Sequence, residues 1–431
     1  MNYSRGMETV ARHIQSEVEE ALDYSRVVML HGARQSGKTT LAEMIAEDRR
    51  GTYVSLDDDD LREGVLADPV AFLASQSYPL VIDEAQRGGD RMIVAVKRLV
   101  DQDRTPGRFL LTGSTNFLTV PNISESLAGR VQIFRLGPLS EAELAGTRSA
   151  EIDSWFEGGP ALYPATDLTR ADYFARVCRG GYPEVIGLDP NQRRHWFANY
   201  VETVVQRDIA TLADIRKAAS LPRLLRWVAS CTSSQINQSD ASRELEVSRP
   251  VVTSYLEWLQ TVFLIHEIPA WSRNLSSRTS RRPKVHVTDT GLAASLMGVD
   301  LHALASPTAP ASGPLLETFA VNEIAHQLAA SRHGYTLHHW RNHQDRKYRG
   351  REIDLIIEAP NGAVVAIEVK ATSSPSADAV NHLRWLRDKL DTSNPGTFRS
   401  GILLHTGPFT LSAGDRLHLR PLNCLWRTVN N

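Results

Sequence analysis

Hydrophobic and polar residues alternate along REIDLIIEAPNGAVVAIEVKAT, residues 351–372, and this pattern predicts a β-hairpin. Pro360-Asn361-Gly362 suits a three-residue loop, because Pro presets the first turn position and Gly takes the left-handed bulge position. The apolar residues predicted to share one face are Ile353, Leu355, Ile357, Val365, Ile367 and Val369. Apolar residues also occur on the opposite face, so we expect other elements to cover the hairpin on both sides.

The charged residues of this hairpin gather at one end. A three-residue loop sets Asp354 opposite Glu368 and Glu352 opposite Lys370, whereas a two-residue loop would put the acids on opposite faces. One interpretation is a salt-bridged end of an amphipathic hairpin. The other is a site for Mg²⁺, with Mn²⁺ as an alternative ion, in which the carboxylates supply oxygen ligands and the lysine orients or activates water.

A second pattern, VVMLHGARQSGKTT at residues 27–40, is an apolar strand followed by a glycine-rich loop and the start of a helix. This sequence matches the P-loop motif in the strand–loop–helix setting that the motif requires. Backbone N–H groups and the helix N-terminus would hold the phosphates of ATP, Lys38 would reach the β- and γ-phosphates, and Thr39 would ligate Mg²⁺. The residues expected to bind the nucleotide are Gly32, Arg34, Ser36, Gly37, Lys38, Thr39, Thr40, Asp83 and Ser114.

Two further apolar runs end in polar residues that complement the P-loop. SYPLVIDEAQR ends with Asp83, which is placed to hold Mg²⁺, and Glu84, which is placed to act as the base for the attacking water. RFLLTGSTN ends with Ser114 and Asn116, either of which would sense the γ-phosphate or position water. Ordinary turn chemistry after a core strand explains this last pair equally well.

Arg130 stands directly before another apolar strand in the segment LAGRVQIF. In a homo-oligomer, an arginine here would neutralise transition-state charge in the site of a neighbouring subunit. A surface arginine explains the position equally well.

Composition narrows the class of protein. A length of 431 residues predicts about three domains, and 42% hydrophobic with 23% charged residues is ordinary for globular chains. No apolar run reaches about 18 residues, the N-terminus lacks the pattern of a signal peptide, and three distant cysteines indicate neither disulfides nor a zinc finger. We therefore expect a cytoplasmic protein without a membrane partner.

The motifs GARQSGKTTL, LVIDEAQ, FLLTGS, LAGRV, GGYPEV and VQRDIA occur in this order. Together they resemble a broad prokaryotic group of AAA+-type ATPases related to the archaeal ATPases. The resemblance covers most of the chain and implies an α/β fold with a P-loop ATPase domain at 1–147 and a helical and winged-helix domain at 148–300. Many members of the group carry a restriction-endonuclease-like α/β/α domain after the ATPase, which corresponds here to 301–431.

The middle of the chain contains a helix-turn-helix pattern at residues 238–268. Ser239 or Asp240 would cap its first helix, and Arg249 would begin its second. The segment 271–284 follows with five basic residues and no acid, and would form a wing. Arg249, Arg273 and Arg281 are expected to contact a duplex, although such units also serve as lids or packing modules. Residues 148–175 contain Gly, Pro and Thr breaks that predict a linker or loose lid.

A helical pattern at residues 314–329 places Glu317 upstream of the hairpin. Taken in order, Glu317, Asp354, Glu368 and Lys370 resemble the core of PD-(D/E)XK nucleases. The resemblance implies that Asp354 and Glu368 bind metal, that Lys370 positions the attacking water and that Glu317 supports the site. The literal Pro-Asp pair of that motif is absent, since Ile353 precedes Asp354.

Basic and aromatic residues interleave at 331–351, where Arg341, Lys347 and the nearby histidines would follow phosphates. The sequence thus favours an ATPase that acts on nucleic acid, with DNA preferred, through a Mg²⁺-dependent phosphodiesterase site. The alternative is an ATP-dependent regulatory switch, or a DNA-binding scaffold, with an inactive nuclease-like domain. A small-molecule P-loop kinase is a third hypothesis, but it leaves Glu84 and the long C-terminal region without a role.

Overall fold

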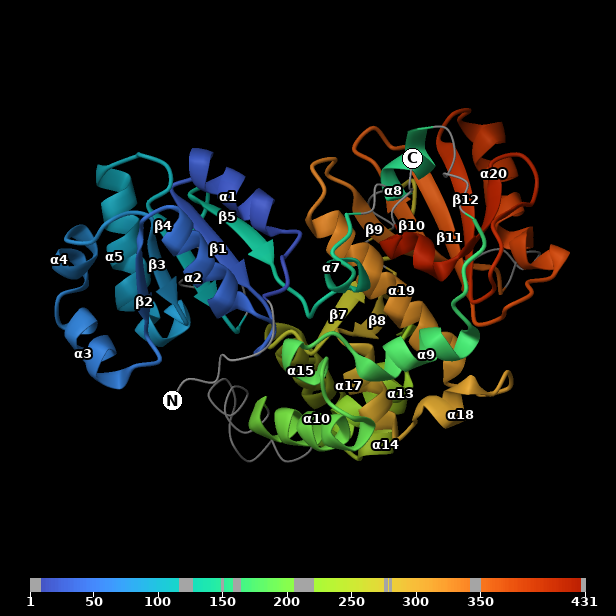
Figure 1. The fold of residues 1–431 in the computed structure, drawn as a ribbon, viewed down its shortest axis with the longest axis horizontal. Helices are drawn as coiled ribbons and strands as arrows, with labels where there is room; N and C mark the ends of the chain where they lie inside the picture. The colour runs from blue at the N-terminus through green and yellow to red at the C-terminus, as the bar shows by residue number, and fades with distance from the viewer. Residues whose placement is uncertain are drawn as a thin grey trace.

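The computed structural model describes residues 9–115, 127–148, 151–157, 164–204, 221–274, 278, 281–341 and 350–427. These residues form an N-terminal unit at the left of Figure 1, a C-terminal unit at the upper right and a mainly helical middle unit below them. Within the described part of the chain, no helix is long and apolar enough to cross a membrane.

The N-terminal unit is a parallel five-stranded sheet in the order β2-β3-β4-β1-β5. Its strands are β1 (Val27–His31), β2 (Thr52–Ser55), β3 (Leu80–Asp83), β4 (Phe109–Gly113) and β5 (Val131–Arg135). Its helices are α1 (Gln15–Tyr24), α2 (Lys38–Asp48), α3 (Asp59–Ala67), α4 (Pro69–Ala74), the 3₁₀ turn η1 (Ala85–Gly88) and α5 (Gly89–Gln102). Apolar residues of α1 and α2 cover one face and those of α5 cover the other, which explains why the central strands are apolar throughout. The carboxyl ends of β1, β3 and β4 meet at one edge.

The middle unit surrounds a small antiparallel sheet in the order β6-β8-β7. Its strands are β6 (Ser234–Gln235), β7 (Ile265–Ile268) and β8 (Lys284–Val287). Its helices are α9 (Arg170–Arg179), the 3₁₀ turn η3 (Pro183–Val185), α10 (Pro190–Val204), α13 (Leu221–Ser230), α14 (Gln238–Leu245), α15 (Arg249–Thr261), α17 (Thr290–Met297) and α18 (Leu301–Ala305). The predicted helix pair is confirmed as α14 and α15, but the side chain of Asn237, not Ser239 or Asp240, caps α14.

The C-terminal unit is a mixed six-stranded sheet in the order β13-β14-β12-β11-β10-β9. Its strands are β9 (Thr336–Arg341), β10 (Glu352–Glu358), β11 (Val364–Lys370), β12 (Phe398–His405), β13 (Leu411–Ser412) and β14 (Leu417–Pro421). The helices around it are α7 (Glu141–Leu144), α8 (Glu151–Glu157), α19 (Ser312–Ala329), α20 (Asn381–Ser393) and the 3₁₀ turns η6 (Ala377–Val380) and η7 (Leu422–Trp426). Apolar residues of α19 and α8 pack on one face and those of α20 on the other, so the prediction of a hairpin covered on both sides is confirmed.

The predicted linker at 148–175 is partly wrong, because α8 and the first residues of α9 are helical. Trp155 of α8 is 1% exposed and lies in the core beside the C-terminal sheet. The Ser400 hydroxyl on β12 donates a hydrogen bond to the Trp155 carbonyl at 2.9 Å. The glycines and prolines near this segment give no sign of the seven-residue helix α8.

The hairpin of β10 and β11 has the predicted three-residue loop. Gly362 has φ of 80°, and the Ala359 N–H donates to the Ala363 carbonyl at 2.8 Å. Leu355 faces Ile367 in the predicted register. The position of Ile353 is a correction: a bulge in β10 between Ile353 and Ile356 turns its side chain to the α20 face, away from Leu355.

Candidate functional sites

The P-loop connects β1 to α2 and brings its expected residues together. Gly32 allows a close backbone approach, since a Cβ there would lie 2.0 Å from the Leu136 carbonyl oxygen. Gly37 has φ of 93° and stands at the N-terminus of α2, a left-handed conformation that glycine adopts without strain. Lys38 is buried, and its Nζ donates to the Ala33 carbonyl at 2.8 Å.

Arg12 holds the P-loop from outside the motif, and sequence analysis did not single it out. Its Nη1 donates to the Ser36 carbonyl at 2.7 Å, while its Nε pairs with Glu143 at 3.0 Å. Both side chains are buried, so the pair fixes the loop to the segment that follows β5. The sequence around Arg12 does not indicate this role, because its partners Ser36 and Glu143 are distant in sequence.

Thr39 and Asp83 meet beneath the P-loop, as expected for a shared Mg²⁺ site. The Thr39 hydroxyl lies 3.1 Å from Asp83 Oδ2, and the Tyr53 hydroxyl donates to the same oxygen at 3.1 Å. A hydroxyl and a carboxylate at the phosphate-binding loop fit Mg²⁺ bound with a nucleotide.

Glu84 lies next to this pair in a left-handed backbone conformation, with φ of 51°. The Ser114 hydroxyl donates to Glu84 Oε2 at 3.1 Å, and Gln86 donates to both residues. The expected base and the expected sensor are therefore in direct contact. Asn116, the other sensor candidate, lies outside the described residues.

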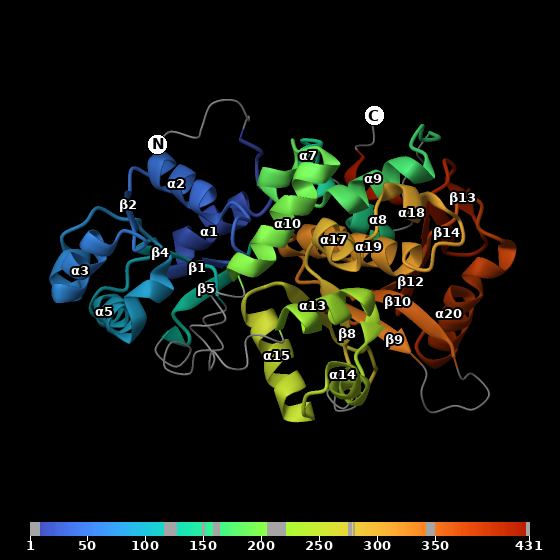
Figure 2. The ribbon, with the colours of Figure 1, turned by 90° about the horizontal axis from the view of Figure 1, so that it is seen from below.

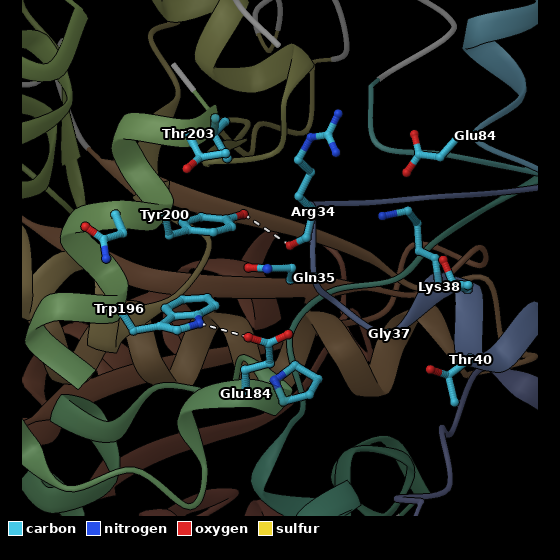
Figure 3. A pocket seen from close by; sticks show the side chains of 14 residues that line it. Arg34, Gln35, Gly37, Lys38, Thr40, Glu84, Glu184, Trp196, Tyr200 and Thr203 are labelled. Carbon is cyan, nitrogen blue, oxygen red and sulfur yellow. Dashed lines mark hydrogen bonds between the residues drawn. The ribbon is translucent and has the colours of Figure 1, made fainter. Parts of the chain in front are cut away.

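A cavity of about 600 Å³ opens over the P-loop, with η3 and α10 forming its opposite wall (Figure 3). Trp196 and Tyr200 of α10 stack with ring centroids 5.0 Å apart, and the Tyr200 hydroxyl donates to the Arg34 carbonyl at 3.2 Å. Trp196 Nε1 donates to Glu184 at 3.1 Å. Thr40 lines this cavity with the P-loop residues. Figure 2 shows α10 between the N-terminal unit and the helices of the middle unit.

A smaller cavity of about 210 Å³ adjoins the first one at Gly37, Thr40 and Pro183, which line both. Its remaining lining residues are mostly apolar or uncharged: Thr9, Val10, Arg12, Gln15, Leu41, Met44 and Leu139. The N-terminal segment and α2 thus form a slot beside the phosphate-binding loop.

Arg130 lies at the N-terminal end of β5, the sheet edge opposite the P-loop, since β5 runs parallel to β1. Its guanidinium forms two hydrogen bonds to Asp101 of its own chain, at 2.6 and 3.1 Å. Arg130 is therefore outside the P-loop site of its own chain, and a role in a neighbouring subunit stays a prediction.

The charged end of the hairpin contains a lysine that sequence analysis did not assign to it. Lys284, the first residue of β8 in the middle unit, is 2% exposed. Its Nζ lies 2.7 Å from Glu317 Oε1, 2.6 Å from Glu352 Oε1 and 3.7 Å from Asp354 Oδ1. A cation from a different unit thus stands among three of the acids.

Glu368 and Lys370 form the other half of this carboxylate cluster. Lys370 Nζ lies 2.6 Å from Glu368 Oε2 and 4.0 Å from Asp354 Oδ2. His382 of α20, also missed by sequence analysis, lies with Nδ1 3.4 Å from Glu368 Oε1. Asp354 Oδ2 accepts the N–H of Val369 at 2.8 Å, so Asp354 stands between the two lysines.

Burial raises the pKa of two carboxylates in this cluster. Burial and the charge of Asp354 raise the pKa of Glu317 to about 8, against the opposing effect of Lys284. Burial and Asp354 also raise the pKa of Glu368. Burial acts to lower the pKa of Lys284, but the carboxylates of the cluster outweigh it and raise that pKa. The acids are therefore buried with too little positive charge to compensate them fully.

Asp354 and Glu368 are the two side chains that could hold a metal here. In the part of the chain that the structure describes, no three His, Cys, Asp or Glu side chains converge as a cation site. Glu368 is 2% exposed, and its Oε1 forms no regular hydrogen bond among the described residues, although His382 Nδ1 lies 3.4 Å away. Two carboxylates on paired strands, one with a buried oxygen that is only weakly satisfied, fit a divalent cation whose remaining ligands are water.

The residues expected to contact nucleic acid lie at separate places. Arg249 is exposed at the start of α15, and Arg273 Nη1 donates to the Ser393 hydroxyl at 2.6 Å. Arg281 is partly buried, and Arg341 lies 3.7 Å from Glu352 beside the carboxylate cluster. Lys347 lies outside the described residues.

The described part of the predicted wing at 271–284 packs on the C-terminal unit. The Trp271 N–H donates to the His339 carbonyl at 2.6 Å, and Arg278 forms two hydrogen bonds with Glu358 at 2.6 and 2.9 Å. His339 is fully buried, with Nε2 3.1 Å from the Arg282 carbonyl oxygen, so the expectation that it follows phosphates is wrong. Arg278 therefore joins this segment to the C-terminal unit through its charge.

Family models match three consecutive parts of the chain. A model described as an AAA domain matches residues 24–145. Two models described as domains of unknown function, DUF8612 and DUF4143, match residues 170–303 and 312–425. The first third of the chain is therefore a P-loop ATPase domain of the AAA type, in agreement with its parallel sheet and loop geometry.

Among solved structures, the chain is similar to the Walker-type ATPase PABY2304 of Pyrococcus abyssi. The identity is 16%, the match covers 67% of this chain and 96% of that one, and the TM-score is 0.43. The RuvB Holliday junction branch migration motor of Thermotoga maritima gives 18% identity over 59% of this chain and 87% of that one, with a TM-score of 0.28.

Among curated proteins, the uncharacterized protein Rv2008c of Mycobacterium tuberculosis (strain ATCC 25618 / H37Rv) is 30% identical over 366 residues. This match covers 85% of the chain and 75% of the relative. The uncharacterized protein Mb2031c of Mycobacterium bovis (strain ATCC BAA-935 / AF2122/97) matches with the same identity and coverage. The chain belongs to the same family as these two mycobacterial proteins.

Proposed function

We propose that this protein is an ATPase that governs a divalent-cation-dependent phosphodiesterase acting on nucleic acid, with DNA as the preferred substrate. The observation that carries the proposal is the convergence of Glu317, Asp354, Glu368 and Lys370 from α19, β10 and β11 at one end of the C-terminal sheet. Carboxylates and a lysine in this arrangement can hold a metal ion and a water molecule against a phosphodiester.

At the ATP site, Lys38 and the backbone of the P-loop bind the phosphates, and the apolar slot beside Gly37 takes the base. Thr39 and Asp83 hold Mg²⁺, which supplies charge compensation at the β- and γ-phosphates when bound. Glu84 accepts a proton from the attacking water, and Ser114 keeps its carboxylate oriented through the hydrogen bond at 3.1 Å.

At the carboxylate cluster, Asp354 and Glu368 hold the divalent cation, which stabilises negative charge on the scissile phosphate when bound. Lys370 positions the attacking water, with its own ammonium fixed by Glu368 at 2.6 Å. Glu317 supports this site from α19. Arg341, at the edge of the cluster, binds a phosphate of the substrate backbone.

The middle unit contributes nucleic-acid contact in this proposal. Helices α14 and α15 followed by the paired strands β7 and β8 correspond to a winged-helix arrangement. Arg249 stands exposed at the start of α15, the helix that would approach a duplex.

The test is cleavage of labelled single- and double-stranded DNA and RNA with Mg²⁺ or Mn²⁺, with and without ATP. Asp354→Asn should abolish cleavage and leave ATP hydrolysis intact, because Asn cannot supply the charge that holds the cation. Asp378→Asn, an exposed acid in η6 of the same unit, is the matched control and should cleave as the wild type does. Equal cleavage by Asp354→Asn and the control would refute the assignment.

A second candidate is favoured by one specific observation, the position of Lys284. An ammonium among Glu317, Glu352 and Asp354 can serve as the permanent counter-charge of an inactive site. The protein would then be a regulatory switch in which the ATP state controls partner binding. Absence of cleavage on every substrate, together with ATP-dependent DNA binding, would select this candidate.

A further inference from the structure

The carboxylate cluster receives charge from two different units of the chain. Glu317, Glu352 and Asp354 belong to the C-terminal unit, whereas Lys284 belongs to the small sheet of the middle unit. Lys284 is 2% exposed, so its ammonium depends on these carboxylates rather than on water. Contacts at 2.7 and 2.6 Å to Glu317 and Glu352 fix it there.

Asp354 is shared between this ammonium and the candidate metal site. Its Oδ1 lies 3.7 Å from Lys284, while its Oδ2 faces Lys370 and the N–H of Val369. Glu368, the other candidate ligand, has a buried oxygen with no regular hydrogen bond among the described residues and with His382 Nδ1 at 3.4 Å. A divalent cation bound by Asp354 and Glu368 would therefore act on the same carboxylate as this ammonium, in a buried setting where such interactions are strong.

We propose that Lys284 is a resident cation that competes with a divalent cation for the carboxylate cluster, so that the docking of β8 sets the metal affinity of the site. The proposal rests on the proposed function in one respect, since Asp354 and Glu368 are taken as the metal ligands. Withdrawal of Lys284 removes the positive charge beside Asp354 and leaves the Glu352 carboxylate without this partner, which strengthens cation binding.

The position of β8 depends on how the middle unit packs against the C-terminal unit. β8 belongs to the same unit as α10, which lines the cavity over the P-loop. The segment before β8 is fixed to the C-terminal unit by Arg278 and Trp271. A change in how these units pack would therefore move Lys284 relative to Asp354, and metal affinity is the quantity that would respond.

The experiment measures Mn²⁺ binding to the full chain by the loss of the free-ion signal in electron paramagnetic resonance. Lys284→Gln should bind Mn²⁺ about tenfold or more tightly than the wild type, the size expected for removing one charge beside a carboxylate. Lys284→Arg keeps the charge and should bind as the wild type does. Lys97→Gln, on α5 of the N-terminal unit, is the matched control and should change nothing.

A second pair of variants keeps the test decisive if Lys284→Gln does not fold. Removal of Lys284 alone leaves buried carboxylates without a positive partner, which destabilises the fold. Glu317→Gln is compared with the double variant Lys284→Gln/Glu317→Gln, in which both partners of the 2.7 Å contact are replaced by neutral amides. The double variant should bind Mn²⁺ more tightly than Glu317→Gln alone. Thermal melting provides an independent readout: Mn²⁺ should raise the melting temperature of Lys284→Gln more than that of the wild type.

The outcomes separate this inference from the proposed function. Binding that depends on Asp354 but has equal affinity with and without Lys284 overturns the competition and leaves the metal site standing. No binding that depends on Asp354 in any variant overturns both.

Discussion

The P-loop site and the carboxylate cluster are built in opposite ways. The P-loop holds its ligand mainly with backbone groups of consecutive residues, Gly32 to Thr39, at the N-terminus of one helix. The cluster is assembled from side chains between Lys284 and His382, carried by five separate elements. The first arrangement is fixed by local conformation, whereas the second depends on how units pack.

The two sites also differ in where the partners of their charged groups come from. In the P-loop, Lys38 is buried against the Ala33 carbonyl of its own loop. In the cluster, the acids rely on Lys284 from another unit, and burial still raises the pKa of Glu317 to about 8. Substitutions in the P-loop should therefore affect one activity sharply, while substitutions in the cluster should affect chemistry and unit packing together.

The largest expected effect is that of Lys38→Ala. Loss of the ammonium that reaches the β- and γ-phosphates should lower ATP hydrolysis by about 10³-fold or more and abolish detectable ATP binding. Filter binding of labelled ATP and phosphate release measure the two effects. Lys97→Ala, on the same unit, should retain both, and hydrolysis by Lys38→Ala at the wild-type rate would contradict the P-loop assignment.

Glu84→Gln should be nearly as damaging to hydrolysis but harmless to binding. The amide cannot accept the proton of the attacking water, so hydrolysis should fall by about 10²- to 10⁴-fold while ATP affinity stays near that of the wild type. Single-turnover hydrolysis with parallel ATP binding measures this separation. A fall in affinity that matches the fall in rate would instead make Glu84 a binding residue.

Acid should lower the stability of the fold through His326 of α19, whose Nε2 would lie 2.2 Å from a Cβ placed on Gly137 in the segment after β5. Burial, above all, lowers the pKa of His326 to about 4 in the folded protein, against about 6.5 in an unfolded chain. Between these values the unfolded chain binds more protons, so stability present at neutral pH is lost as the pH falls from about 6.5 toward 4. At about pH 5 this residue alone lowers the free energy of unfolding by about 2 kcal/mol.

Chemical denaturation at neutral pH and at about pH 5 checks whether the free energy of unfolding falls as predicted. His326→Gln should show a smaller loss of stability between the two conditions than the wild type. An equal loss in both proteins would assign the acid sensitivity to other groups.

The smallest expected effect is that of Arg130→Ala. Its pair with Asp101 is solvent-exposed, so thermal melting of the variant should match that of the wild type. If Arg130 acts in a neighbouring subunit, its loss should slow hydrolysis only where the protein oligomerises. Equal hydrolysis at every protein concentration would remove that role.

Sequence reasoning located the P-loop site because Gly37, Lys38 and Thr39 have fixed roles at fixed spacing. The three-residue loop and the pairing of Leu355 with Ile367 were also predictable, since Pro360-Asn361-Gly362 suits that loop length. The predicted pairs Asp354–Glu368 and Glu352–Lys370 lie beyond the regular ladder, and Glu352 contacts Lys284. Sequence reasoning missed the bulge that turns Ile353 over, because a single inserted residue leaves no mark in an alternating pattern.

Contacts between residues that are distant in sequence could not be predicted from local sequence patterns. Lys284 was counted within a basic wing, and nothing near it in sequence indicates a buried partnership with Glu317. Arg12, which precedes α1, and Tyr200 of α10 reach the P-loop from distant parts of the chain in the same way. Such contacts follow from tertiary arrangement and not from local pattern.

The most direct measurement assays ATP hydrolysis and Mn²⁺-dependent strand cleavage on the same preparations of wild type, Lys38→Ala and Asp354→Asn. The account predicts that Lys38→Ala loses hydrolysis, and that Asp354→Asn loses cleavage while hydrolysing ATP at the wild-type rate. Cleavage that persists in Asp354→Asn, or its absence from all three proteins while the wild type hydrolyses ATP, would contradict the phosphodiesterase proposal.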